Sequence, residues 1–319
     1  MTQATTALEL EGGRIAVTGG AGFIGVHSVE ALLDAGADVL VIDDLRHASS
    51  RPLPSTARLE AVDIAEPEAR AAIEAWRPTS VLHLAAQGGV NRSWREPALD
   101  AHINVLGTMS VLVAAMAAGC RRVVVASSGG ALYGAARRLP SPEDEPAQPR
   151  SPYGTAKLSI EYYLDHFTRS GAIDALALRY GNVYGPGQDG TGEAGVVAIS
   201  SLRLLSGKAP VLRGDGTQTR DFTYVGDIVA ANVLGLSSNV TGALNIGTGR
   251  ETSIGDLVGR LCERAGYRGE PEREPLPPGE VARSALDNSL AAERLGWRPA
   301  VALDDGLART LESFRAHLR

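Results

Sequence analysis

Hydrophobic positions in the first half of the chain alternate between short apolar runs and longer amphipathic runs. The first apolar run is RIAVT at Arg14–Thr18, and helical periodicity follows it directly. The pattern predicts strands at 14–18, 38–42, 58–62, 80–84, 122–126 and 173–178, with helices at 23–35, 67–76, 99–118 and 153–170. Apolar strands joined by helical crossovers indicate an α/β fold with a doubly wound parallel sheet, covered by helices on both faces.

The regular alternation of apolar and amphipathic runs ends after residue 133. A proline-rich loop occupies 139–152, and beyond residue 181 isolated strands and helices at 225–236, 253–265 and 303–317 stand among Gly/Pro-rich connections. We expect a Rossmann-like domain over 1–178 and a smaller mixed α/β lobe over 179–319, with some interchange of chain between them.

Composition and charge exclude several classes of protein. The chain has 319 residues and a net charge of −6, and no run of Lys and Arg stands out, which disfavours nucleic-acid binding. Two cysteines fit neither a disulfide scaffold nor a zinc site. We expect no membrane span and, because residues 1–12 lack the features of a secretory signal, a cytoplasmic protein.

The sharpest local motif is TGGAGFIG at 18–25, between the first predicted strand and helix. Gly19 permits a tight turn, Gly22 lets the backbone approach a pyrophosphate, and Gly25 allows the helix to pack closely on the sheet. This placement favours a dinucleotide site over a merely structural turn. The predicted cofactor contacts here are Gly19, Gly22, Phe23, Ile24 and Gly25.

Acidic residues follow the second and third predicted strands. Asp43 lies 18 residues after Gly25, where a carboxylate accepts hydrogen bonds from ribose hydroxyls and repels a 2′-phosphate, so NAD is favoured over NADP. Arg46 and Arg51 lie close by, which leaves a phosphate-tolerant site open. Asp63 and Ile64 are suited to the adenine edge of the cofactor, or to simple helix capping and packing.

A tyrosine and a lysine stand four residues apart in YGTAK. That spacing places Tyr153 and Lys157 on one helix face. An ammonium beside a phenol is expected to lower the pKa of the tyrosine, which prepares it for general base catalysis.

Five motifs together resemble the extended short-chain dehydrogenase/reductase superfamily, and among its members the nucleotide-sugar 4-epimerases of the UDP-glucose/UDP-glucuronate group. They are TGGAGFIG, HLAA at 83–86, YGTAK at 153–157, RYGN at 179–182 and RDF at 220–222. The resemblance implies a tightly held NAD, a C-terminal lobe that binds a UDP-sugar, and a homodimer formed through the helices around 99–118 and 153–170.

The resemblance also assigns roles around the cofactor. Tyr153 is the base that takes the proton from the sugar O4, and Lys157 holds the nicotinamide ribose. The remaining cofactor contacts implied by the family pattern are Leu84, Ala85, Ala86, Asn104 and Tyr180.

One position departs from the family pattern. The family usually has Ser or Thr where this chain has Gly129, so we expect Ser128, or alternatively Ser127, to supply the hydroxyl that bridges the sugar O4. The next residues, Gly130 and Ala131, are not ionisable either, whereas the family's 4,6-dehydratases and decarboxylases carry acidic residues in this run. Epimerisation at C4 is the reaction that remains.

Substrate contacts implied by the resemblance lie in the second half. Arg220 is suited to the diphosphate, because its guanidinium fork can bind two phosphates, although an ion pair with Asp221 is an alternative. Pro277 stands where the family has an arginine, so Arg283 is expected to replace it. The predicted substrate contacts are Asn182, Val211, Arg213, Arg220, Glu280, Arg283 and Ser284.

The position that gates the sugar pocket in the family is Ser284 here. Because serine is small and polar, it leaves room for a C6 carboxylate, and we expect UDP-glucuronate to be preferred narrowly over UDP-glucose. Thr191 is a further polar candidate near the sugar. The alternatives are a UDP-glucose/UDP-galactose 4-epimerase, a nucleotide-sugar reductase that uses exchangeable NADPH, and a catalytically silent NAD-binding scaffold.

Overall fold

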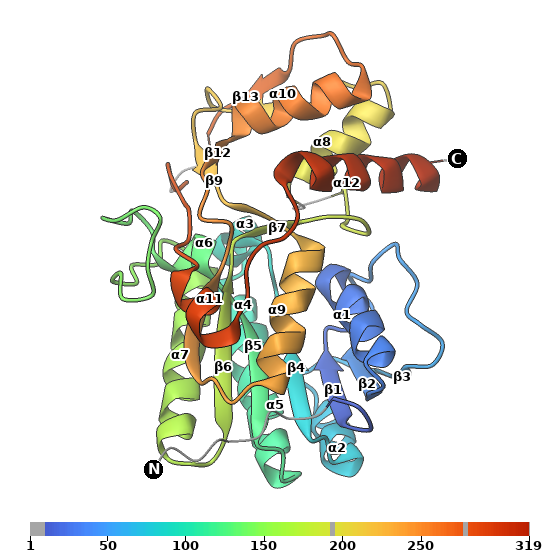
Figure 1. The fold of residues 1–319 in the computed structure, drawn as a ribbon, viewed down its shortest axis with the longest axis vertical. Coiled ribbons are helices and arrows are strands. Elements are labelled where there is room, and N and C mark those ends of the chain that lie inside the picture. Colours follow the sequence, from blue (N-terminus) through green and yellow to red (C-terminus); the bar gives the residue numbers. More distant parts are fainter. Residues whose placement is uncertain (1–9, 192–194, 277–279, 319) are drawn as a thin grey trace.

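The computed structural model describes all residues except 1–9, 192–194, 277–279 and 319 (Figure 1). Its centre is a seven-stranded, wholly parallel sheet with the order β11-β6-β5-β4-β1-β2-β3. The strands are β1 (Arg14–Thr18), β2 (Asp38–Asp43), β3 (Arg58–Ala61), β4 (Ser80–His83), β5 (Arg122–Ser128), β6 (Asp174–Tyr180) and β11 (Gly242–Ile246). The predicted doubly wound fold is confirmed, and the order reverses between β1 and β4, where such sheets bind ligands.

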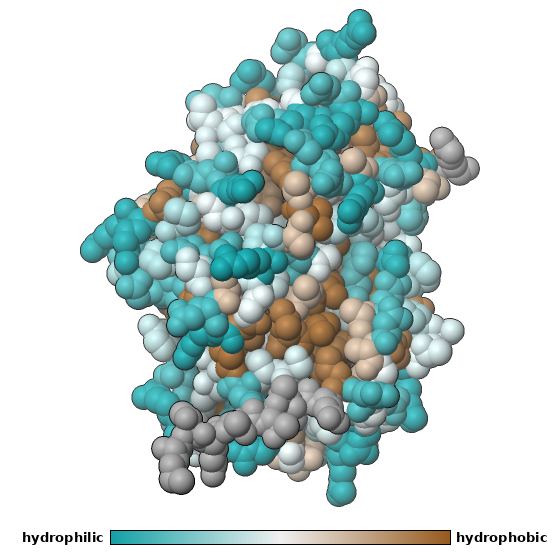
Figure 2. Space-filling model, viewed as in Figure 1, coloured by the Kyte–Doolittle hydropathy of each residue, from teal (hydrophilic) through white to brown (hydrophobic). Residues whose placement is uncertain are grey.

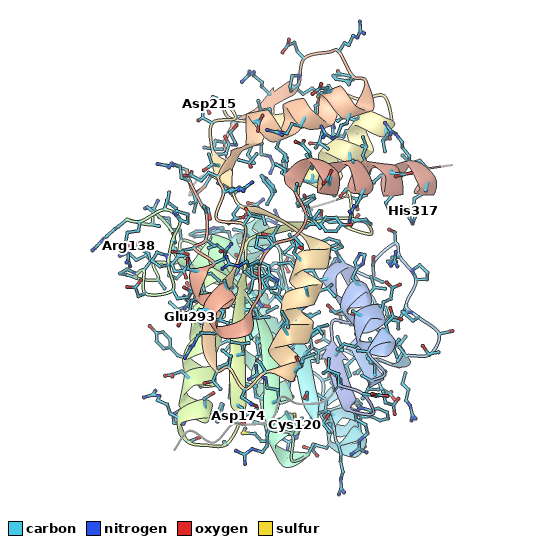
Figure 3. All side chains as sticks on the ribbon, in the orientation of Figure 1. Cys120, Arg138, Asp174, Asp215, Glu293 and His317 are labelled. Atoms are coloured by element: carbon cyan, nitrogen blue, oxygen red, sulfur yellow. The ribbon has the colours of Figure 1, made fainter. Side chains whose placement is uncertain are left out.

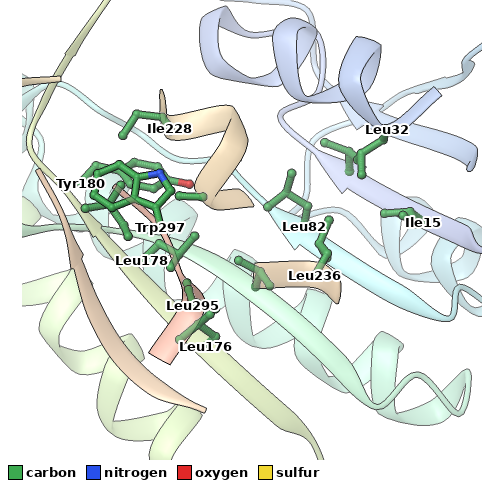
Figure 4. Close-up of a cluster of buried hydrophobic side chains, with 14 of the residues drawn as sticks. Ile15, Leu32, Leu82, Leu176, Leu178, Tyr180, Ile228, Leu236, Leu295 and Trp297 are labelled. Carbon is green, nitrogen blue, oxygen red and sulfur yellow. The ribbon is translucent and has the colours of Figure 1, made fainter. Parts of the chain in front are cut away.

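Helices cover both faces of this sheet. One face carries α2 (Pro67–Trp76), α5 (Thr108–Ala117) and α7 (Pro152–Arg169), whose apolar side chains pack with those of β2, β4, β5 and β6. The other face carries α1 (Phe23–Asp34), α9 (Val225–Ser237) and α11 (Ser289–Leu295). On that face Trp297 packs with Leu178, Ile228 and Leu295 (Figure 4), and hydrophobic side chains gather over α9 in the space-filling view (Figure 2).

The chain crosses between the two lobes more than once. The expected boundary at residue 178 falls inside β6, and β11, α9 and α11 return from the second half of the chain to the sheet. The second half therefore completes the core of the first.

A smaller lobe sits above the carboxyl ends of the strands (Figure 1). Its core is formed by the apolar faces of its helices, with Leu212, Phe222 and Tyr184 between them. Its elements are β7 (Asn182–Tyr184), α8 (Val196–Leu205), β8 (Val211–Arg213), β9 (Thr219–Arg220), β10 (Phe222–Tyr224), β12 (Thr252–Ser253), α10 (Ile254–Ala265), β13 (Glu272–Glu274) and α12 (Leu303–His317).

The helix predicted at 99–118 is interrupted by a π-helical turn. It is built from α4 (Pro97–Ala101), the π-turn η1 (His102–Gly107) and α5, and it follows the short α3 (Val90–Arg95). By length and composition alone, Pro97–Ala117 could cross a membrane, and 44% of its apolar window is buried in the fold. π-turns often occur at functional sites.

Candidate active site

The glycine-rich turn between β1 and α1 forms a cradle that side chains would fill. Gly19 has a φ of +69°, and a Cβ there would lie 2.6 Å from the backbone nitrogen of Ala85, on the loop after β4. A Cβ on Gly25 would collide with the carbonyl oxygen of Gly19. Because the N-cap of α1 is Gly22, which makes no side-chain cap, the free N–H groups of the first turn are left for an anion. The turn fits the pyrophosphate of a dinucleotide.

Asp43 ends β2 beside this turn and is 8% exposed. Its carboxylate accepts hydrogen bonds from the backbone N–H of Ala21 at 3.0 Å and of Leu45 at 2.8 Å. Burial raises the pKa of this carboxyl, although the two N–H donors oppose the rise. The carboxylate is held at the sheet edge where a ribose binds in this fold.

Arg46, whose position near Asp43 is compatible with NADP binding, forms ion pairs with two neighbouring carboxylates. Arg46 lies 3.4 Å from the carboxylate of Asp44 and 3.3 Å from that of Asp63. These contacts compete with a 2′-phosphate for the guanidinium. Ile64, the neighbour of Asp63, is 5% exposed, and its side chain packs against Gly107.

Asn104, in the π-turn, holds the loop that follows β4. Its side-chain Oδ1 accepts from the N–H of Gln87 at 2.9 Å, and its Nδ2 donates to the carbonyl of Gln87 at 3.0 Å and to Asp100 at 2.9 Å. This loop contains Leu84, half-buried like Ala85, and the exposed Ala86. The amide of Asn104 therefore positions the predicted cofactor contacts.

Tyr153 and Lys157 lie on the first turns of α7, as predicted. The helix begins after Ser151, whose hydroxyl accepts from the N–H of Gly154 at 3.1 Å. The Tyr153 phenol faces the Ser128 hydroxyl at the end of β5, which lowers the tyrosine pKa, and Lys157 Nζ donates to the carbonyl of Ala126 at 2.9 Å. A phenol, a hydroxyl and an ammonium are thus brought together at the carboxyl edge of the sheet.

The pKa values of this pair differ from the expectation. Burial raises the pKa of Tyr153 to about 12 and lowers that of Lys157 to about 8. The prediction that the lysine depresses the tyrosine pKa is wrong for this structure, because Lys157 Nζ is directed at a carbonyl and lies 5.8 Å from the centre of the phenol ring.

The two serines at the end of β5 have different partners. Ser127 is 6% exposed and donates to Glu161 at 2.6 Å, so its hydroxyl points into the protein, whereas Ser128 contacts Tyr153. A Cβ at Gly129 would lie 2.5 Å from Leu286, which fills the place of the side chain that is missing there.

A cavity of about 310 Å³ is lined by elements of the smaller lobe, and one of its wall residues, Asn182, directs its side-chain oxygen towards Gly130, two residues after Ser128. Its walls bring together five predicted substrate contacts: Asn182, Val211, Arg213, Arg220 and Glu280. Arg220 is paired with Glu280. The alternative pairing with Asp221 does not occur, because that carboxylate is 1% exposed and accepts from Thr248 and Leu286 instead.

Other predicted residues lie outside this cavity. Arg283 is exposed and binds Glu251 at 2.8 Å, and Ser284 is 9% exposed. Thr191 is exposed and donates to Asp189. Pro277 lies outside the described residues.

Tyr180 differs from its predicted role beside the cofactor. It is 5% exposed within the hydrophobic core, and its hydroxyl donates to Asn232 of α9 at 2.5 Å. Its alternation along β6 directs it towards α9 rather than to the edge of the sheet.

Comparison with known proteins identifies the family. Residues 15–247 match the NAD dependent epimerase/dehydratase family. The chain belongs to this family. A UDP-glucose 4-epimerase of Mycolicibacterium smegmatis is 42% identical over 95% of this chain and 98% of its own length. The UDP-glucose 4-epimerase of Thermotoga maritima, solved with UDP-glucose, is 44% identical, with a TM-score of 0.94 over 96% of this chain and 100% of that one.

Further members of the NAD dependent epimerase/dehydratase family bear on cofactor and substrate. The UDP-glucose 4-epimerase of Thermus thermophilus, solved with NAD, is 40% identical, with a TM-score of 0.89 over 95% of this chain and 99% of that one. A UDP-glucuronate 4-epimerase of Thermodesulfobacterium geofontis is more distant, at 29% identity over 92% of this chain and 94% of its own length. The protein is an NAD-dependent enzyme of the epimerase group.

Sequence reasoning missed the polar groups that surround the catalytic helix. Asp100 is 1% exposed and has one oxygen without a hydrogen-bond partner, and the side chain of Glu161, which is 9% exposed, is paired with Arg179. Glu161 could have been found from the sequence, because it lies one helical turn after Lys157 and therefore on the same face of the helix. Cys120 lies at the far end of the sheet from the lobe (Figure 3), and burial raises its pKa to about 12.

Proposed function

We propose that this enzyme interconverts UDP-sugars that differ in configuration at C4, with UDP-glucose as its main substrate. The observation that carries the proposal is the meeting of Tyr153 and Lys157 of α7 with Ser128 and the carbonyl of Ala126 at the end of β5, in a chain whose lobe has a cavity that contains Arg220. Relatives named UDP-glucose 4-epimerase at 40–44% identity support it.

Each catalytic side chain has one task in this reaction. The glycine turn, Asp43 and Lys157 would hold NAD, which would supply reversible hydride transfer at C4 of the sugar. Tyr153, in its phenolate form, takes the proton from O4 as the hydride leaves and gives it back afterwards. Ser128 donates to O4 and bridges it to the phenol, and Lys157 holds the ribose of the cofactor.

The run after Ser128 argues against the family's other reactions. Gly129, Gly130 and Ala131 carry no acid or base, and the space above Gly129 is filled by Leu286. Elimination of water from the sugar needs a group that removes a proton from carbon. This run supplies none, so C4 epimerisation is favoured.

Binding of the UDP-sugar requires a rearrangement of one ion pair. Arg220 and Glu280 bind each other across the cavity. A diphosphate carries more charge than a carboxylate and matches the guanidinium fork, so it displaces Glu280 from Arg220. Glu280 is then free to accept hydrogen bonds from the uridine ribose.

UDP-glucuronate is the second candidate substrate, and Ser284 is the observation that favours it. Ser284 does not line the cavity that contains Arg220, but the family resemblance places this position at the gate of the sugar pocket. A small residue at such a gate leaves room for the C6 carboxylate, and its hydroxyl can donate a hydrogen bond. A relative named UDP-glucuronate 4-epimerase is 29% identical, and MoeE5, solved with UDP-glucuronic acid, is 35% identical, whereas UDP-glucose 4-epimerases reach 42% and 44% identity.

The two sugars are distinguished by comparing wild type with Ser284→Tyr on each. We expect wild type to have the higher kcat/KM on UDP-glucose. If UDP-glucuronate is also turned over, Ser284→Tyr should reduce its kcat/KM far more than that of UDP-glucose, because the ring occupies the space of the carboxylate. A higher wild-type kcat/KM on UDP-glucuronate contradicts the choice of sugar but not the epimerase.

We also propose that two copies associate through the outer face of α3, η1 and α7. Large apolar side chains are exposed on it: Trp94 is 59% exposed, Leu106 60% and Tyr162 68%. The helix α7 packs against both α3 and η1, which brings the three elements that carry these side chains together. Leu106→Glu should convert a dimer to a monomer in light scattering, and a monomeric wild type contradicts this proposal.

A further inference from the structure

Three successive residues at the end of β5 are bound by three side chains of α7. The carbonyl of Ala126 accepts from Lys157, Ser127 donates to Glu161, and Ser128 contacts Tyr153. The α7 residues are 153, 157 and 161, so they recur every four positions along one face of the helix. The strand end is therefore fastened to the catalytic helix on both sides of Ser127.

The carboxylate of Glu161 is itself fixed by an arginine. Arg179 donates to it through Nε at 3.0 Å and through Nη2 at 2.6 Å, and the two side chains are 9% and 11% exposed. Arg179 is the neighbour of Ser127 in the β5–β6 register. Its third donor, Nη1, binds the hydroxyl of Tyr133 at 2.7 Å, which in turn donates to Asn245 at 2.8 Å.

These contacts leave neither Glu161 nor Ser127 exposed to a ligand. A buried ion pair is weak evidence for a gain in stability, because apolar residues of similar volume often serve equally well. What the pair does specify is geometry, since it fixes the residue immediately before Ser128. Displacements of about 1 Å at a catalytic group can cost about 10²-fold in rate.

We propose that Glu161, fixed by Arg179, is a positioning residue that holds the end of β5 through Ser127 and so keeps Ser128 in contact with Tyr153. The inference rests on the proposed epimerase function for its kinetic consequence. The structural consequence, the Ser128–Tyr153 contact, does not depend on that function.

The charge of Glu161 supplies a second, independent readout. Lys157 is faced by Glu161 from its own helix, by Asp100 from α4, by His83 from β4 and by the ring of Tyr153. Both carboxylates raise the pKa of Lys157 against the effect of burial, which lowers it to about 8. Removal of the Glu161 charge should lower that pKa further, so that the ammonium is lost at lower pH.

The test compares Ser127→Ala and Glu161→Gln with wild type, and uses Ser159→Ala as a matched control. Ser159 is on α7 as well, but its hydroxyl binds only the carbonyl of Thr155. We expect kcat to fall about 10- to 100-fold in both test variants, with KM within about threefold, bound NAD retained and the control unchanged. The basic limb of the kcat profile should move to lower pH in Glu161→Gln but not in Ser127→Ala.

Other outcomes separate this role from its alternatives. If Ser127 touches the sugar directly, Ser127→Ala loses activity while Glu161→Gln, which keeps the hydroxyl, does not, and the proposal is overturned. Wild-type kcat in both variants overturns it as well. If Glu161→Gln does not fold, the nearly isosteric Ser127→Ala is the test. A lower kcat in this variant supports the positioning role, and a wild-type kcat overturns it.

A structural measurement tests the positioning role of Glu161 independently of the proposed epimerase function. If wild type epimerises no UDP-sugar, the proposed function fails, and crystal structures of wild type and Ser127→Ala then test the positioning role alone. A distance between Ser128 Oγ and Tyr153 Oη that is longer in Ser127→Ala than in wild type supports it. An unchanged contact overturns it.

Discussion

The phenolic hydroxyl of Tyr153 can be removed without disturbing the packing of α7. Tyr153→Phe should fold and keep NAD, yet lose about 10²–10⁴-fold or more of kcat, because the proton on O4 has no acceptor. Steady-state kinetics on UDP-glucose and the cofactor content of the purified variant measure both effects. Tyr267→Phe, in the lobe, is the control and should match wild type. A Tyr153→Phe enzyme within a few-fold of wild type would refute the role of this residue as the base.

Asp43 sets the choice of cofactor at the residue scale. Since it offers a carboxylate at the ribose site and Arg46 is engaged by Asp44 and Asp63, wild type should release NAD and not NADP on denaturation. Asp43→Ala should weaken NAD retention and narrow the preference over NADP. Mass spectrometry of the released cofactor is the measurement, and NADP in the wild-type protein would show that Arg46 outweighs Asp43.

At the scale of elements, the packing of Leu286 against α6 (Gly129–Leu132) explains why the serine or threonine usual in the family is absent. Gly129→Ser should destabilise the fold by about 1–3 kcal/mol through overpacking against Leu286. Leu286→Ala should remove that penalty, so the double variant should be more stable than the sum of the single changes by about 1 kcal/mol. Urea unfolding measures the cycle.

The control for this cycle is Gly259→Ser, on α10. A Cβ at Gly259 meets no heavy atom within 4 Å, so this variant should show no overpacking penalty. Strict additivity of the changes at Gly129 and Leu286 would mean that the two positions do not interact.

The parallel sheet could be predicted from the sequence because its strands are continuous apolar runs separated by helical periodicity. Six predicted strands were found, whereas β11 was not foreseen, since GALNI resembles many short apolar runs and joins the sheet only through pairing with β6. The same limit applies to the π-turn. Its geometry depends on the contacts of Asn104 with Gln87 and Asp100.

The site residues that belong to motifs with a fixed sequence spacing could be predicted. The glycine turn and the Tyr153–Lys157 pair have fixed offsets, so they were located correctly on β1–α1 and α7. Side-chain direction was not predictable: Ser127 and Ser128 are adjacent, and only the strand register and Glu161 show which of them faces inwards. For Tyr180, the core role results from α9, which comes from a distant part of the chain.

At the scale of the whole molecule, a buried histidine links the cofactor domain's strands and helices. His83 on β4 contacts Thr18 of β1 at 2.6 Å and Thr108 of α5 at 2.8 Å, and it is 1% exposed. Burial lowers its pKa from 6.5 to about 3, so the folded protein keeps it neutral where the unfolded chain protonates it. Stability from this source is present above pH 6.5 and falls as the pH drops towards 3.

This linkage predicts a pH dependence that a histidine variant should flatten. Wild type should lose about 2 kcal/mol of unfolding free energy between pH 7 and pH 5 through His83, because each pH unit contributes up to about 1.4 kcal/mol. His83→Gln should be less stable at pH 7 but show a smaller loss on acidification. His317→Gln, on the exposed last turn of α12, is the control. Equal slopes in wild type and His83→Gln would contradict the assignment of a buried neutral imidazole.

The reaction itself is tested most directly by one measurement on the whole enzyme. Purified protein is incubated with UDP-glucose without added cofactor, and the sugar nucleotides are resolved over time. We predict conversion to UDP-galactose up to equilibrium, with no net release of NADH, because the hydride returns to the sugar in every turnover. Bound NAD with no turnover of any UDP-sugar would indicate a silent scaffold, and a reduced product formed only with added NADPH would indicate a reductase. Either result would contradict the proposed function.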